Sequence, residues 1–189
     1  MIATRTLSGR RVRLVPVRLE HTELFVRWNA DAEVRHWLHR SEDPLELLGL
    51  EAVERRMRQL LADPTELRFV IEADDGLPIG DVGLLAIHPH GRAELSIRIG
   101  EKTHWSRGYG GDAIRTLLRF AFEELGLRRV TLIADADNAR GIACYERCGF
   151  RHEGVLRAHR LRHGRPLDMV TMAVLREELT AHEGDDGPR

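Results

Sequence analysis

The glycine-rich segment Trp105–Ala113, with the sequence WSRGYGGDA, has the residue types and spacing of an anion-binding turn. It follows an alternating, strand-like run at 93–99 and leads into a long amphipathic, helix-like run. Gly108, Gly110 and Gly111 leave the first backbone amides of that helix uncovered, and the helix dipole adds positive potential there. A phosphate or pyrophosphate is the expected guest, so we predict that the chain binds a nucleotide-like cofactor.

Two common phosphate-binding motifs do not fit this segment. The dinucleotide fingerprint requires Gly-x-Gly-x-x-Gly, and the P-loop requires an ending of Gly-Lys-Ser/Thr; neither pattern occurs here. A glycine cluster alone often marks nothing more than a tight turn. The position of this cluster between a strand and a helix is what favours a cofactor site.

Cysteine and histidine usage does not indicate a metal site. Cys144 and Cys148 are one helical turn apart, which differs from the spacing of paired zinc ligands. The ten histidines are scattered, and no predicted helix carries an H-x-x-x-H pair. We therefore expect no metal, and two reduced thiols packed on a helix.

Size and charge place the chain among ordinary globular proteins. Its 189 residues are enough for one domain with a core, which we assign to residues 1–182, followed by a disordered tail at 183–189. The formal net charge of −1 does not indicate a nucleic-acid or membrane partner. The N-terminus lacks the apolar block of a signal peptide, and no apolar run could span a bilayer. A cytoplasmic protein is expected.

Hydrophobic periodicity predicts the elements that must position the glycine turn. Strands are expected at 12–17, 69–73, 79–87, 93–99, 130–134, 150–156 and 167–174. Helices are expected at 20–38 (broken near 29–31), 44–61, 113–125 and 138–148. This order combines helices with a sheet and indicates an α/β (α+β) fold.

The order of strand, glycine turn, helix, strand and capped helix carries a family resemblance. With Asn138, Tyr145 and the pair Gly149-Phe150, it resembles the GCN5-related N-acetyltransferase (GNAT) superfamily, and more narrowly its RimJ/RimL branch. The resemblance covers residues 12–175. It implies a mixed, mostly antiparallel twisted sheet flanked by helices, whose fourth and fifth strands splay apart for acetyl-CoA.

The resemblance also implies which residues hold acetyl-CoA. In the superfamily the turn reads Gln/Arg-x-x-Gly-x-Gly/Ala; here Trp105 stands at the first position, although the backbone amides remain available. Pyrophosphate would lie in the turn, and the pantetheine arm would lie along the fourth strand and touch Asn138. The expected cofactor-binding residues are Ile97, Ile99, Arg107, Gly108, Tyr109, Gly110, Gly111 and Asn138. Asn138 taken alone is equally consistent with a helix N-cap.

By the same resemblance, Tyr145 donates a proton to the departing CoA thiolate. A phenol with a pKa near ~10 suits this role because it stays protonated at neutral pH. The alternative for Tyr145 is an aromatic ring packed beside the sheet. Some relatives carry a glutamate base on the fifth strand, twelve residues before the tyrosine, but this chain has Ile133 there.

Glu94 is the best candidate to replace that base. It lies on the polar face of the expected fourth strand, where Ser96 could position a water molecule. A solvated carboxylate, or an ion pair with Arg92, is the competing interpretation. Proton loss to bulk water without a dedicated base also remains open.

Candidate acceptor-site residues come from the helices that should flank the mouth of the pocket. These are Trp28, Glu33 and Trp37, although tryptophans in such helices more often belong to the core. The polar loop 88–92 is similar to a loop of polyamine acetyltransferases and points to spermidine-like acceptors.

The expected function is direct transfer of acetyl from the CoA thioester to a primary amine. The acceptor would be a protein N-terminus, a polyamine or an aminoglycoside-like small molecule, and the protein a monomer or homodimer. The alternative is a non-catalytic acyl-CoA-binding sensor or accessory module.

Overall fold

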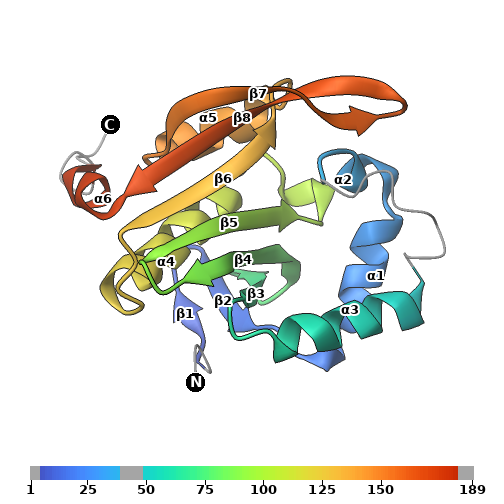
Figure 1. Cartoon of the computed structure of the whole chain (residues 1–189). Coiled ribbons are helices and arrows are strands. Elements are labelled where there is room, and N and C mark those ends of the chain that lie inside the picture. The colour runs from blue at the N-terminus through green and yellow to red at the C-terminus, as the bar shows by residue number, and fades with distance from the viewer. Residues whose placement is uncertain (1–4, 39–48, 183–189) are drawn as a thin grey trace.

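The computed structural model describes residues 5–38 and 49–182, and one sheet of eight strands runs through these ranges (Figure 1). The strands are β1 Leu7–Ser8, β2 Val12–Pro16, β3 Leu67–Ala73, β4 Pro78–His88, β5 Arg92–Ile99, β6 Arg129–Asp135, β7 Arg151–Arg162 and β8 Arg165–Leu175. The helices are η1 Leu19–His21, α1 Thr22–Ala30, α2 Ala32–His36, α3 Leu50–Ala62, η3 Lys102–His104, α4 Tyr109–Glu123, α5 Ala139–Arg147 and α6 Arg176–His182.

The centre of the sheet contains the splayed strand pair that the family resemblance implies. The strand order is β1-β2-β3-β4-β5-β6-β8-β7, and every neighbouring pair is antiparallel except β5 with β6. These two strands pair only from Arg92↔Arg129 to Glu94↔Thr131 and then diverge. The predicted mixed, mostly antiparallel sheet with a splayed pair is therefore confirmed. The predicted fourth and fifth strands are β5 and β6, because the two-residue β1 precedes them.

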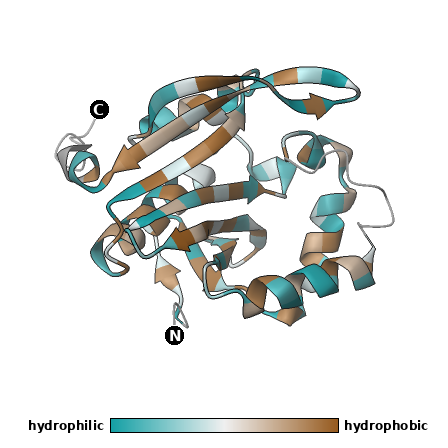
Figure 2. Cartoon of the chain, viewed as in Figure 1, coloured by the Kyte–Doolittle hydropathy of each residue, from teal (hydrophilic) through white to brown (hydrophobic). Residues whose placement is uncertain are grey.

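Two clusters of buried side chains hold helices against the sheet. The larger includes Ile114, Leu117 and Leu118 of α4, which are fully buried with the strand residues. The smaller packs α1 and α3 together and includes Trp28 and Met57. Figure 2 shows hydrophobic and hydrophilic segments alternating along these helices and strands, as the predicted periodicity requires.

Local signals explain where several elements begin and end. The break predicted between helices at 29–31 is confirmed: Asp31 Oδ1 accepts hydrogen bonds from the amides of Glu33 and Val34, at 2.9 and 3.2 Å, and so caps α2. α4 is preceded by Gly108 at φ +87° and followed by Gly126 at φ +71°, a backbone region that glycine enters without strain.

The C-terminal hairpin is longer than predicted. The strand expected to end at residue 156 continues to Arg162, and a tight turn at His163-Gly164 then leads into β8. The prediction stopped early because β7 is mostly exposed on both faces, so it lacks the apolar alternation that marks a strand. β1 and α6 were not predicted, and part of the helix expected at 44–61 lies outside the described residues.

Within the described ranges no helix has the length and apolar character needed to cross a membrane. The predicted tail at 183–189 lies outside these ranges, and the assignment of 1–182 to one domain stays a prediction.

Candidate active site

A cavity of about 480 Å³ opens where β5 separates from β6, beside the starts of α4 and α5. Six of the eight predicted cofactor residues line it: Ile97, Ile99, Gly108, Gly110, Gly111 and Asn138. We call it the cofactor cavity. The tertiary structure brings together residues from β5, the glycine turn and α5, which lie up to about forty positions apart in the sequence.

The charge of this cavity suits a polyanionic molecule. Its lining within the described chain includes Arg98, Arg115, Arg140 and Arg147 and no aspartate or glutamate. The first amides of α4 add the positive end of a helix dipole. CoA carries a diphosphate and a 3′-phosphate, so the residues present fit it. When bound, acetyl-CoA supplies an acetyl thioester.

Gly110 is the position at which cofactor binding can be tested with little disturbance of the fold. A Cβ added there would meet Ile99 Cγ1 at 3.7 Å and Ile97 Cδ1 at 4.0 Å, which are ordinary contacts. Because both isoleucines line the cofactor cavity, the added group would point into the space for CoA. We expect Gly110→Val to weaken acetyl-CoA binding by about tenfold or more, measured by calorimetry.

The matched control is Gly154→Val on β7, where an added Cβ meets only Thr171 Oγ1, at 3.7 Å. This variant should bind acetyl-CoA like the unmodified protein. Normal binding by a folded Gly110→Val protein, with an unchanged Tm and circular dichroism spectrum, would show that the cofactor lies elsewhere.

Two predicted cofactor residues do not line the cavity. Tyr109 is 3% exposed, and its hydroxyl donates a 3.0 Å hydrogen bond to Asp74. Arg107 is exposed, and its guanidinium donates to the Thr103 carbonyl at 3.4 Å. Both residues flank Gly108 in the predicted motif, but the core holds the Tyr109 ring and the Thr103 carbonyl binds Arg107, so neither side chain lines the cavity.

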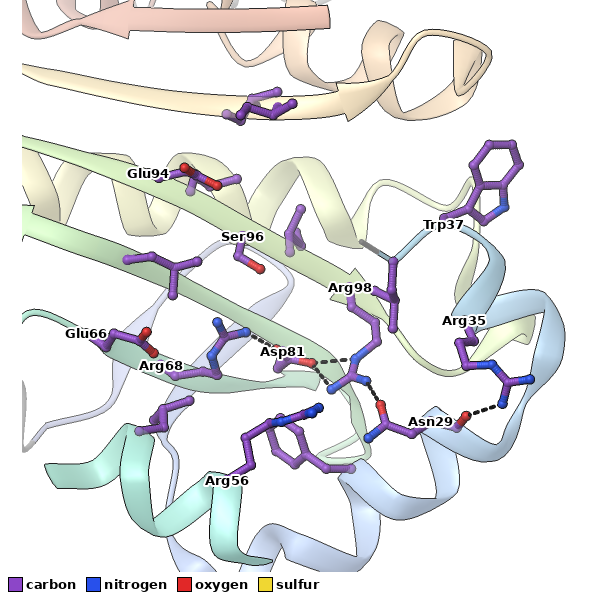
Figure 3. Close-up of a pocket in the computed structure, with 18 of the residues that line it drawn as sticks. Asn29, Arg35, Trp37, Arg56, Glu66, Arg68, Asp81, Glu94, Ser96 and Arg98 are labelled. Atoms are coloured by element: carbon purple, nitrogen blue, oxygen red, sulfur yellow. Dashed lines mark hydrogen bonds and ion pairs between the residues drawn. The ribbon is translucent and has the colours of Figure 1, made fainter. Parts of the chain in front are cut away.

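A second cavity, of about 540 Å³, lies on the other side of β5 (Figure 3). We call it the acceptor cavity. It meets the cofactor cavity at residues that line both: Trp37, Leu38, Ile97, Arg98, Asn138 and Tyr145. An amine in one cavity and a thioester in the other would therefore come together beside Tyr145.

Asn138 and Tyr145 owe their positions to α5. The Asn138 Oδ1 accepts a 3.0 Å hydrogen bond from the Gly141 amide, so it caps the helix and also lines both cavities. Tyr145 follows two helical turns later, its ring packed edge-on to Phe150 at 6.2 Å. Burial, with smaller contributions from Cys144 and Cys148, raises the pKa of Tyr145. The phenol therefore stays protonated well above neutral pH.

Cys144 lines the cofactor cavity, and both Cys144 and Cys148 are free thiols. A hydrogen bond from Cys148, helped by Arg147 and Arg115, lowers the pKa of Cys144 to about 7 despite its burial. The same hydrogen bond and burial raise the pKa of Cys148. Cys148 Sγ lies 3.5 Å from the Gly111 carbonyl, so it links α5 to the start of α4.

Glu94 lines the acceptor cavity together with Ser96 and Ile133, so the three residues predicted around the base position lie in one place. Glu94 belongs to the last paired position of β5 and β6, where the strands begin to separate. Its half-buried carboxylate forms no ion pair with Arg92 or with any other residue that the structure describes. It is therefore available to a cationic group in the cavity.

The floor of the acceptor cavity is an ion cluster that was not predicted. Asp81, on β4, accepts 2.6 Å hydrogen bonds from Arg98 Nε and from Arg68 Nη1, and Arg98 Nη1 donates to Asn29 Oδ1 at 2.6 Å (Figure 3). Burial alone would raise the pKa of Asp81, but the two arginines outweigh it and lower that pKa. The available signal was Asp81, a lone carboxylate inside the mainly apolar run of β4.

A second unpredicted ion cluster anchors the long hairpin beside the cavity. Asp135, at the end of β6, is 2–3% exposed and pairs with Arg160 at 2.8 Å and Arg162 at 3.1 Å. Arg162 also lies over Trp37, 5.7 Å from its ring. The register between β7 and β8 shifts between Leu156 and Arg160, just before the two arginines. The sequence alone did not reveal these ion pairs.

The predicted acceptor-site helices contribute unequally. Trp37 lines both cavities. Trp28 is buried in the core with 1% of its surface exposed, and its Nε1 donates a 2.9 Å hydrogen bond to Glu101. Glu33 is exposed and forms an ion pair with Lys102, with 3.1 Å between Oε2 and Nζ. The structure therefore does not bring Trp28 or Glu33 to the acceptor cavity. The polar loop 88–92 does not line it either.

Within the described residues, no group of three histidine, cysteine, aspartate or glutamate side chains could hold a metal ion. The site is thus an arginine-lined cavity and an acceptor cavity that meet at a protonated phenol.

Comparison with known proteins agrees with this architecture. The family model "Acetyltransferase (GNAT) domain" matches residues 11–151. The spermidine N(1)-acetyltransferase of Escherichia coli (strain K12) is 28% identical over 182 residues, covering 95% of this chain and 94% of that protein. The uncharacterized N-acetyltransferase p20 of Bacillus licheniformis is 24% identical over 185 residues, covering 92% and 97%.

The fold is also that of a solved acetyltransferase. The structure of the spermidine N-acetyltransferase from Vibrio cholerae, in complex with CoA and spermine, superposes with a TM-score of 0.81 at 24% identity, covering 89% of this chain and 98% of that one. The chain belongs to the GNAT acetyltransferase family. It is an acyltransferase that uses acetyl-CoA.

Proposed function

We propose that this enzyme transfers acetyl from acetyl-CoA directly to a primary amine of a small diamine or polyamine bound in the acceptor cavity. The observation that carries the proposal is the meeting of the two cavities at Tyr145, with the unpaired Glu94 carboxylate in the acceptor cavity. In this assignment Tyr145 and Glu94 are the catalytic residues.

The chemistry requires three proton movements. An amine with a pKa near ~10 must lose a proton before it attacks, and Glu94 accepts that proton directly or through a water near Ser96. The amine nitrogen then forms a bond to the acetyl carbon as the carbon–sulfur bond breaks. Tyr145 donates its phenolic proton to the leaving sulfur, and its raised pKa keeps that proton available. The product nitrogen, still positively charged after the attack, loses its second proton to the resulting phenolate, which gives the neutral amide and restores Tyr145.

A second carboxylate in the same cavity supports a diamine rather than a monoamine. Glu66 immediately precedes β3 and lines the acceptor cavity, as Glu94 does (Figure 3). Leu67 of β3 pairs with Leu84 of β4, and the next residue of β4, Leu85, pairs with Glu94 of β5. Glu66, which precedes Leu67, therefore lies in the same row across the sheet as Glu94. Two strand spacings, about 10 Å, separate the two backbones, so the carboxylates are placed for the two ends of one linear diamine.

Sequence similarity supports the same acceptor class. The Escherichia coli relative acts on spermidine by its name, and it is similar along nearly the whole chain. A protein N-terminus, as in the RimJ/RimL branch, is the competing acceptor. A cytosolic location, with reduced Cys144 and Cys148, belongs to the same proposal.

The acceptor proposal is tested by thiol release from acetyl-CoA with spermidine, putrescine, butylamine and short peptides. Glu66→Gln is expected to raise the KM for spermidine and putrescine about tenfold, because a charge-assisted hydrogen bond to the second ammonium is lost. The KM for butylamine, which has no second amine, should not change. Glu94→Gln should lower kcat for every amine.

The control is Glu123→Gln, an exposed residue of α4 that lines neither cavity. Turnover of peptide N-termini alone would contradict the diamine assignment and favour the RimJ/RimL type of acceptor. Tight acetyl-CoA binding without thiol release from any of these amines would instead favour the non-catalytic sensor.

A further inference from the structure

Trp105, the residue that departs from the family's cofactor turn, makes two specific contacts. Its indole Nε1 donates a 2.8 Å hydrogen bond to the Ile99 carbonyl at the end of β5. Its ring lies 4.1 Å from the guanidinium carbon of Arg140, the second residue of α5. The indole therefore connects β5, the glycine turn and α5 at one edge of the cofactor cavity.

The stacked guanidinium remains available for a ligand. A ring face attracts the cation and restricts its motion, while all five N–H donors at the edge of the guanidinium stay free to bind an anion. Arg140 is exposed and lines the cofactor cavity with Trp105 and Gly108. The nearest acid in the sequence, Asp137, is already paired with Arg162. Among the residues that the structure describes, Arg140 has no carboxylate partner.

We propose that Arg140, held on the Trp105 ring, binds a phosphate at the nucleotide end of CoA. The family pattern places a polar glutamine or arginine at position 105, where this chain has tryptophan. The side chain that the turn lacks is supplied from α5 instead, and Trp105 acts as a positioning residue. The Ile99 hydrogen bond keeps the indole in the orientation that stacking requires.

The experiment measures Kd by calorimetry for CoA, 3′-dephospho-CoA and pantetheine, independently of turnover. Arg140→Gln is expected to weaken CoA binding about tenfold, because charge-assisted hydrogen bonds to phosphate are lost. It should leave pantetheine binding unchanged and make CoA binding less dependent on salt. If Arg140→Gln leaves the Kd for 3′-dephospho-CoA unchanged, Arg140 contacts the 3′-phosphate. If the substitution weakens binding of 3′-dephospho-CoA as much as binding of CoA, Arg140 contacts the diphosphate.

Substitutions of Trp105 test the positioning role. Trp105→Leu removes the ring and should weaken CoA binding, and Arg140→Gln should then have little additional effect. Trp105→Phe keeps a ring face and should retain more of the affinity. Arg165→Gln, at the exposed start of β8, removes a charge outside both cavities and serves as the control.

Two results would overturn the proposal. One is a CoA Kd for Arg140→Gln equal to that of the control variant. The other is equal weakening of CoA and pantetheine, which would make Arg140 a structural residue. Neither result bears on the acceptor, because no amine is present in the binding experiment.

Discussion

Replacement of Tyr145 by phenylalanine is expected to lower kcat by about 10²–10⁴-fold, while the Kd for acetyl-CoA stays nearly unchanged. Phenylalanine keeps the ring and its packing against Phe150, so the substitution removes only the proton donor. Without that donor, the thiolate must leave unprotonated or take a proton from water. Fixed-time assays of thiol release at saturating acetyl-CoA measure kcat, and calorimetry measures the Kd for acetyl-CoA.

The pH dependence of the same reaction provides a second measurement. The acid form of Tyr145 is the active form, and burial raises its pKa above the ordinary value of ~10. Loss of its proton therefore cannot lower kcat until the pH exceeds that value. We expect kcat of the unmodified enzyme to show no decline from Tyr145 below about pH 10. A decline at lower pH that disappears in Tyr145→Phe would contradict this expectation.

The other tyrosine offers a matched control. Tyr109→Phe loses one hydrogen bond, to Asp74, and Tyr109 does not line either cavity. Its kcat should remain close to that of the unmodified enzyme. Equal kcat values for Tyr145→Phe and Tyr109→Phe would remove Tyr145 from the mechanism.

Asp81→Asn is expected to lower the free energy of unfolding by about 3–5 kcal/mol. Asp81 is 2% exposed and is the shared counter-charge of Arg68 and Arg98, whose side chains are 13% and 9% exposed. Neutralising it leaves two nearly buried guanidinium groups without their carboxylate. Urea unfolding followed by circular dichroism measures the difference.

The stabilisation by Asp81 should depend on pH, and the lowered pKa of Asp81 sets the direction of that dependence. A carboxylate with a pKa below its unfolded value stabilises the fold above that unfolded value, and this stability is lost as the pH falls through the folded pKa. The stability gap between the unmodified protein and Asp81→Asn should thus be full at pH 7 and shrink below about pH 4. A gap that stays constant to lower pH would mean that the charge of Asp81 is not its source.

Asp75→Asn serves as the surface control. Asp75 is exposed, and its Oδ1 accepts a 3.0 Å hydrogen bond from the Leu77 amide, a bond that asparagine can also accept. The expected change is within about 0.5 kcal/mol. A similar loss in both variants would contradict a special role for the buried cluster.

Much of the fold was predictable because local signals and the global architecture agree. The alternation at 93–99 became β5, and the apolar spacing of Ile114, Leu117 and Leu118 became the buried face of α4. Asp31 stops one helix and caps the next through its own carboxylate. Each of these features depends on contacts within a few residues, which a sequence displays directly.

The hairpin β7–β8 was only partly predictable for the opposite reason. Its outer half is exposed on both faces, and a register shift between Leu156 and Arg160 interrupts the pairing. Cross-strand ion pairs with Asp135, not apolar alternation, hold this part of the strand beside the sheet. Such pairs join residues 25 or more positions apart and leave no periodic signal.

The sequence by itself determined the residue types of the site: glycines at the start of a helix, a capping Asn138, and Tyr145 two turns later. Asn138 and Tyr145 are seven positions apart, so helix geometry alone places them on one side of α5. Only the tertiary structure decided which side chains face the reaction. Where β5 diverges from β6, two cavities meet at Tyr145. Glu66 lines one of them and Arg140 the other, whereas Trp28 is buried in the core. These positions depend on strand pairing and helix packing, which join residues far apart in the chain.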